Sequence, residues 1–162
     1  MARIFCIANQ KGGVGKTTTC VNLAAGLATA GQRVLMIDLD PQGNATMGSG
    51  IDKRGLSKSV YHLLVGLGTV ADARVRSESG GYDLIPANRD LAGAEVELVG
   101  LDRRENRLRD ALALHQSEYD FILIDCPPSL SLLTLNRLCV AHGVIIPMPC
   151  EYCALAGPSD PA

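Results

Sequence analysis

Short apolar runs alternate with segments of helical periodicity along most of this 162-residue chain. The continuous runs are typical of strands buried on both faces of a sheet, and they lie at residues 4–8, 34–37, 121–124 and 144–146. Residues 82–85 predict a further short strand. Apolar residues spaced by three or four positions fall between them, at 20–27, 60–67, 88–115 and 129–141. This alternation predicts an α/β fold with a doubly wound, mostly parallel sheet and helices on both faces.

Polar and conformationally special residues mark where these elements should end. Gly31 offers a C-terminal cap for the first helix, and Ser129, after two prolines, can cap the helix that begins there. Residues 42–58 are rich in Gly, Asn, Thr and Ser and predict a long loop. A connection of that length in a compact domain is usually functional.

The C-terminal residues end the pattern in an unexpected way. Residues 157–162 read Gly-Pro-Ser-Asp-Pro-Ala, and two prolines in this stretch forbid a regular helix. The strand at 144–146 is then expected at or near an edge of the sheet. With no internal repeat or linker, we expect one nucleotide-binding domain over residues 1–156, shortened at its C-terminal side, and an irregular tail over 157–162.

Composition narrows the possible functions. An apolar content of 47% excludes disorder, while an aromatic content of 4% without Trp makes aromatic platforms for stacking bases an unlikely design. The net charge of −2 gives no global basic field that would attract nucleic acid. No apolar run has the length of a membrane span, and the N-terminus lacks the features of a signal peptide. We therefore expect a cytoplasmic protein that does not bind a membrane.

The six cysteines are irregularly spaced in a chain with a large core, which favours reduced thiols over a disulfide framework. Cys6 lies in a strand pattern and Cys20 and Cys139 lie in helix patterns, where a thiol serves as a small hydrophobic group. Cys150 and Cys153 form a single C-x-x-C pair. Such a pair could form half of a metal site shared between two subunits, and the sequence leaves that alternative open.

A glycine-rich segment follows the first apolar run. Residues 11–18 read Lys-Gly-Gly-Val-Gly-Lys-Thr-Thr and join a predicted strand to a predicted helix. Such a loop directs backbone N–H groups at a phosphate, and the helix N-terminus adds partial positive charge. The expected cofactor-binding residues are Gly12, Gly13, Val14, Gly15, Lys16, Thr17 and Thr18.

Two lysines distinguish this loop from an ordinary phosphate loop. Lys16 is placed to reach the β- and γ-phosphates of a nucleotide, and the hydroxyl of Thr17 to bind Mg²⁺. The strict pattern has a glycine at position 10, where this chain has Gln10. Lys11 follows it and gives the loop a second cation beside the phosphates.

Three carboxylates follow two of the predicted strands. Ligands of doubly wound sheets bind outside the carboxyl ends of the strands, where Asp38, Asp40 and Asp125 are expected. Mg²⁺ prefers oxygen ligands and keeps several waters, so we expect Asp125 to hold it through water while Thr17 binds it directly. Asp38 is a candidate for holding the water shell of the metal, and Asp40 for activating the attacking water.

A dinucleotide-binding Rossmann domain is the competing interpretation of this pattern. Gly13 and Gly15 supply a G-x-G, but Thr18 occupies the position of the third glycine. Lys16 would also direct a charge at a pyrophosphate that needs only backbone donors. These departures disfavour a dehydrogenase.

Several segments together closely resemble the ParA/Soj chromosome- and plasmid-partitioning ATPases, which belong to the deviant-Walker group that also includes MinD. The resemblance lies in residues 11–18, 38–46 (Asp-Leu-Asp-Pro-Gln-Gly-Asn-Ala-Thr), 86–88, 93–98, 124–130 and 151–152. It covers the chain to about Ala156. The loop motif alone is shared with cobyrinic acid a,c-diamide synthases, nitrogenase iron proteins and iron–sulfur carriers, whereas the 38–46 segment points to partition proteins.

The resemblance implies a dimer switch driven by ATP and Mg²⁺, in which two subunits enclose two nucleotides. Lys11 of one subunit would reach the phosphates of the other, and Lys16, Asp40 and Asp125 would match the phosphate-binding, water-activating and Walker B residues. Family members also bind DNA non-specifically, associate with the nucleoid and are stimulated by a ParB-like partner. They continue well beyond the length of this chain, so we expect it to lack the DNA-binding surface.

Three alternatives stay open beside a partition ATPase. The chain could be a non-functional fragment that folds poorly, or an iron–sulfur carrier that uses Cys150 and Cys153 across a dimer. An amide ligase similar to cobyrinic acid a,c-diamide synthase would need a second, glutamine-handling domain, for which this chain has no room.

Overall fold

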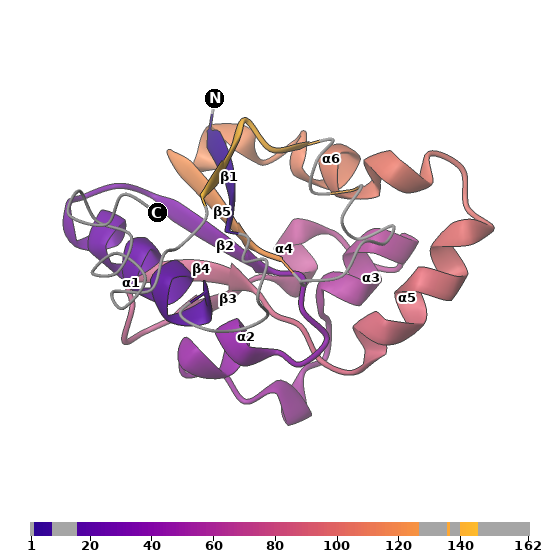
Figure 1. The fold of residues 1–162 in the computed structure, drawn as a ribbon, viewed down its shortest axis with the longest axis horizontal. Coiled ribbons are helices and arrows are strands. Elements are labelled where there is room, and N and C mark those ends of the chain that lie inside the picture. The colour runs from indigo at the N-terminus through magenta and orange to yellow at the C-terminus, as the bar shows by residue number, and fades with distance from the viewer. Residues whose placement is uncertain (1, 8–15, 127–135, 137–139, 146–162) are drawn as a thin grey trace, which may run out of the picture.

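The computed structural model describes residues 2–7, 16–126, 136 and 140–145 (Figure 1). Within them the chain forms one six-stranded sheet with the strand order β3-β4-β2-β5-β1-β6. The strands are β1 (Arg3–Ile7), β2 (Val34–Asp38), β3 (Val75–Ser77), β4 (Tyr82–Ile85), β5 (Phe121–Asp125) and β6 (Gly143–Ile145). All pairs are parallel except β3 with β4, which confirms the predicted mostly parallel sheet.

Helices cover both faces of this sheet (Figure 1). They are α1 (Lys16–Thr29), α2 (Asn44–Gly48), α3 (Val60–Val65), α4 (Val70–Ala73), α5 (Asp90–Val99) and α6 (Arg107–Leu112). Single 3₁₀ turns lie at Lys53–Gly55, Arg104–Asn106 and Gln116–Glu118. Helices α1 and α2 contribute to the core on one face, while α3 to α6 contribute to the core on the other.

Alternation along the central strands explains the two cores. Leu123 of β5 packs in the cluster that includes α1, while its neighbours Ile122 and Ile124 pack in the opposite cluster. Residues in register on parallel strands face the same side, so the same alternation runs through β1 and β2. The continuous apolar runs in the sequence reflect this burial on both faces.

The structure corrects the prediction for residues 42–58. This segment contains the short helix α2 and a 3₁₀ turn, so the prediction of one long loop was wrong. A five-residue helix has too little length for a periodic apolar pattern, and it forms here because its residues bond to the end of β2. Strand β3 was also missed, because its three residues depend on pairing with β4.

Other predictions agree with the described part of the chain or lie outside it. The last predicted strand is observed as β6, at one end of the described sheet. Of the helix predicted over 129–141, Asn136 and Val140 are helical, and most of its other residues lie outside the described part. Cys150, Cys153 and the tail at 157–162 also lie outside it. None of the described helices is long and apolar enough to cross a membrane.

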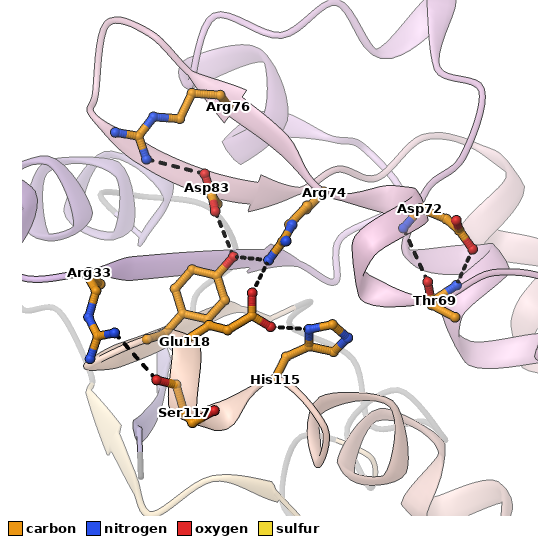
Figure 2. A network of polar contacts seen from close by, with 10 residues as sticks. Arg33, Thr69, Asp72, Arg74, Arg76, Asp83, His115, Ser117 and Glu118 are labelled. Atoms are coloured by element: carbon orange, nitrogen blue, oxygen red, sulfur yellow. Dashed lines mark hydrogen bonds and ion pairs between the residues drawn. The ribbon is translucent and has the colours of Figure 1, made fainter.

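A polar network ties the β3–β4 hairpin to the segment that enters β5 (Figure 2). Arg74 donates to Glu118 at 2.9 Å and to the hydroxyl of Tyr119 at 3.0 Å. The Tyr119 hydroxyl donates to Asp83 of β4 at 2.6 Å, and His115 contacts Glu118 from the other side. Burial and the bond to Asp83 raise the pKa of Tyr119 to about 12, so this hydroxyl keeps its proton at neutral pH.

Candidate nucleotide-binding site

The ends of three neighbouring strands lie level with one another at one edge of the sheet. Asp125 at the end of β5 is in register with Ile7 of β1 on one side and with Asp38 of β2 on the other. The amide of Leu39 donates to the Asp125 carbonyl at 2.8 Å, and that of Cys126 donates to the Ile7 carbonyl at 3.3 Å. The backbone ladder therefore brings two predicted site carboxylates onto adjacent strands.

The chain between β1 and α1 carries the predicted phosphate loop. Lys11, Gly12, Gly13, Val14 and Gly15 lie outside the described residues. Lys16 and Thr17 form the first residues of α1, so the helix begins where the sequence predicted, and Thr18 follows as an exposed residue. Helix α1 packs on the sheet face toward which Asp38 and Asp125 alternate, two residues beyond Met36 and Leu123.

Asp38 is fully buried and accepts three hydrogen bonds from the residues that follow it. Its Oδ1 accepts from the amide of Asp40 at 3.0 Å, and its Oδ2 accepts from the amide and hydroxyl of Thr46 at 2.9 and 2.7 Å. Burial raises the pKa of Asp38 to about 6, against the lowering effect of these hydrogen bonds. The carboxylate thus organises the turn after β2.

Asp40 lies at the surface end of that turn. It is 9% exposed, and its Oδ1 accepts from the amide of Gln42 at 3.0 Å. The peptide carbonyl of Asp40 accepts from the amide of Gly43 at 2.9 Å. Asp40 is therefore held by its own loop, next to Asp38 and on the edge of the sheet where the sequence predicted it.

Sequence reasoning missed Thr46 and Ala87. The Thr46 hydroxyl donates to Asp38 and accepts from the amide of Ala87 at 2.9 Å, and all three residues are fully buried. Ala87 acts through its backbone, which leaves no signal in a residue type. Thr46 ends the Asp-Pro-Gln-Gly-Asn-Ala-Thr segment, so a signal for it was present but had no role attached to it.

The described residues fit a magnesium site that is completed by a nucleotide. Asp38 and Asp125 are fully buried and place carboxylates on adjacent strands, and carboxylate oxygen is the kind of ligand that Mg²⁺ prefers. No group of three or more His, Cys, Asp or Glu side chains gathers in the described part of the chain.

The raised pKa of Asp38 can be measured directly. In the nucleotide-free protein, we expect the carboxyl carbon of Asp38 to titrate with a midpoint near pH 6 by NMR, against an ordinary value of 3.8. Because the folded pKa lies above the unfolded one, the contribution of this group to stability is greatest below about pH 4 and is lost as the pH rises to about 6. Asp52 serves as the internal control, because its bonds to Arg54 lower its pKa. A midpoint for Asp38 below pH 4 would contradict the burial argument.

The parallel sheet, the glycine- and lysine-rich segment between β1 and α1, and acidic residues at the ends of β2 and β5 define the class of P-loop α/β proteins. The family described as an AAA domain matches residues 2–160. The chain belongs to this family, and curated relatives named ParA and Soj align with nearly its whole length.

Curated relatives from several bacteria align with nearly the whole chain. A Pseudomonas putida protein is 65% identical over 99% of this chain and 61% of its own length. The chromosome partitioning protein ParA of Myxococcus xanthus is 54% identical over 99% of this chain and 56% of its own. The sporulation initiation inhibitor protein Soj of Bacillus subtilis is also 54% identical, over 99% of this chain and 63% of its own. The chain thus spans about three fifths of the length of these relatives.

A solved structure agrees with the fold. Cobyrinic acid a,c-diamide synthase from Mycobacterium smegmatis, with bound ATP analog and magnesium, superposes with a TM-score of 0.88 at 48% sequence identity. The match covers 93% of this chain and 62% of that one. The bound nucleotide and metal belong to that protein.

Proposed function

We propose that this chain binds ATP and Mg²⁺ at the carboxyl edge of its sheet and acts as a nucleotide-dependent dimer switch in chromosome or plasmid segregation. The observation that carries the proposal is the register of Asp38 with Asp125, which sets two buried carboxylates on adjacent strands. The strand of Asp125 in turn pairs with β1, which leads into the lysine-rich loop. The ParA and Soj names of the curated relatives support the cellular role.

Each predicted site residue has a role in this proposal. The backbone amides of Gly12 to Thr18 and the ammonium of Lys16 would bind the phosphates, and Thr17, Asp38 and Asp125 would hold the metal or its waters. Bound magnesium would neutralise charge on the terminal phosphates. Asp40 would orient the attacking water and accept its proton.

The second subunit supplies the remaining cation. Lys11 of one copy would reach the phosphates bound by the other. This contact would explain why a lysine stands at the head of the loop. A cation supplied in trans raises the rate of other nucleotide hydrolases by about 10³ to 10⁵. A ParB-like activator and non-specific DNA are the further partners that the family resemblance implies, and we propose them for the whole protein.

Melting with and without nucleotide tests the proposal. We expect MgATP at a hundred times its Kd to stabilise the folded chain by about 2.7 kcal/mol. For a domain of this size, that corresponds to a rise in Tm of about 5–10 °C. The same MgATP should convert monomer to dimer in size-exclusion chromatography with light scattering, and phosphate release should follow.

The outcomes separate the alternatives. A cooperative transition that MgATP leaves unmoved contradicts the nucleotide site, and a chain without a cooperative transition supports the poorly folded fragment. Visible absorption after anaerobic reconstitution with iron and sulfide supports the iron–sulfur carrier. The name of the M. smegmatis structure favours an amide ligase as a second candidate, for which hydrolysis should depend on cobyrinic acid and an amide donor.

A further inference from the structure

The hydroxyl of Thr46 is the contact point between two loops at the carboxyl edge of the sheet. It donates to Oδ2 of Asp38 at 2.7 Å and accepts from the amide of Ala87 at 2.9 Å. Asp38 ends β2, and Ala87 lies just beyond the end of β4. Thr46, Asp38 and Ala87 are each 0% exposed, so water offers no substitute for either hydrogen bond.

The loop between Asp38 and Thr46 is closely packed on the same neighbour. Gly43 has a φ of 67°, and a Cβ at this position would come within 2.8 Å of the Ala87 carbonyl oxygen. The loop therefore approaches the backbone at Ala87 at two points, Gly43 and Thr46. Both residues lie in the segment that follows Asp40, between Pro41 and Thr46.

Asp38 extends this arrangement to Asp40. While its Oδ2 is held by Thr46, its Oδ1 accepts from the amide of Asp40 at 3.0 Å. The carboxylate of Asp40 then accepts from the amide of Gln42 at 3.0 Å. Asp40 is thus linked through Asp38 to a chain of hydrogen bonds that ends at Thr46 and Ala87.

We propose that Thr46 is a positioning residue, whose hydroxyl clamps the loop of Asp40 to the end of β4 and so fixes the position of the Asp40 carboxylate beyond the end of β2. The role of Asp40 in this statement rests on the proposed function. The clamp needs a group that donates and accepts at once, which serine retains and valine lacks. Valine keeps the shape of threonine, so it removes the hydroxyl with little change in packing.

Amide exchange tests the clamp without nucleotide. In Thr46→Val, we expect the amides of Asp40 and Gln42, which do not contact Thr46, to exchange about tenfold faster than in the wild type. Thr46→Ser should restore the wild-type rates. Ala87, which loses its acceptor in the valine variant, serves as the positive control for the measurement. Unchanged exchange at Asp40 and Gln42 would overturn the proposal.

Ser49→Ala provides a matched control. Ser49 is 2% exposed, follows the same short helix, and its hydroxyl contacts the hydroxyl of Tyr82 at 2.6 Å. Loss of this hydroxyl should lower Tm to a similar degree but leave exchange at Asp40 and Gln42 unchanged. If amide exchange at Asp40 and Gln42 is accelerated equally in Thr46→Val and Ser49→Ala, Thr46 contributes only to general stability, and the positioning role is overturned.

Hydrolysis provides the second readout. Below the melting range of every variant, we expect Thr46→Val to lower kcat about tenfold with KM for ATP unchanged, Thr46→Ser to restore it, and Ser49→Ala to leave it intact. An unchanged kcat in the valine variant would overturn the positioning of Asp40 for reaction. If wild-type protein melts cooperatively but neither binds nor hydrolyses ATP, the proposed function fails, and the exchange rates still decide whether Thr46 clamps the loop.

Discussion

Lys16→Ala should remove at least half of the stabilisation that MgATP gives to this protein. The ammonium of a lysine at the start of α1 is the only side-chain cation that the loop pattern assigns to the β- and γ-phosphates of the same subunit. A charge-assisted hydrogen bond to such a group contributes about 1.5–3 kcal/mol, and its loss weakens binding by roughly ten- to a hundredfold.

The expected change in melting follows from that loss. At a nucleotide concentration that is a hundred times the wild-type Kd, a hundredfold weaker site is only half filled. The stabilisation then falls from about 2.7 to about 0.4 kcal/mol, and the rise in Tm falls from about 5–10 °C to about 1–2 °C. Differential scanning fluorimetry with and without MgATP measures both values.

Lys58→Ala is the matched control, because it removes the same charge elsewhere. The Lys58 ammonium donates to the Leu67 carbonyl at 3.2 Å and so joins the segments before and after α3. This variant should keep the full response to MgATP. If Lys16→Ala keeps that response as well, the phosphate loop is not the site of nucleotide binding.

Ile124→Ala should cause the largest loss of stability among single substitutions near the site. Ile124 is fully buried in β5, which lies between β1 and β2 at the centre of the sheet. Truncation of a buried isoleucine to alanine costs about 2–5 kcal/mol, through lost burial and the cavity that remains. For a domain of this size we expect a decrease in Tm of about 4–20 °C.

The reference for this loss is Val96→Ala. Val96 lies on the outer side of α5 and is 78% exposed, so its truncation should change the free energy of unfolding by less than about 0.5 kcal/mol. Denaturant melts of both variants give the difference directly. A similar small effect for Ile124 would mean that β5 does not occupy the centre of the folded core.

The strongest elements of the fold were accessible from sequence because their burial leaves a pattern. β2 and β5 are buried on both faces, and their apolar runs predicted them with an error of about one residue. The apolar run at 4–8 predicted β1 as well, with its position shifted by one residue from the observed strand. α2 and β3 were not predictable in this way, because tertiary hydrogen bonds hold α2 and pairing with β4 defines β3.

The sequence also predicted some features of the candidate site and not others. Asp38, Asp40 and Asp125 could be identified because carboxylates that follow apolar strands are conspicuous in an α/β pattern. What Asp38 does there could not be deduced, because its partners are two backbone amides and the hydroxyl of Thr46. Spacing along a chain places charged groups at an edge of a sheet, but it does not reveal which donors fold back onto them.

The burial of two carboxylates at the ends of β2 and β5 sets a limit on how far this protein can be made heat-resistant. Removing acidic groups from water disfavours folding, and the rest of the sheet has to compensate. Selection for thermostability alone would therefore favour neutral residues at these two positions. Selection for the proposed nucleotide chemistry would keep the carboxylates there. Engineering for heat resistance should instead target the outward-facing residues of the helices, where stability and chemistry do not compete.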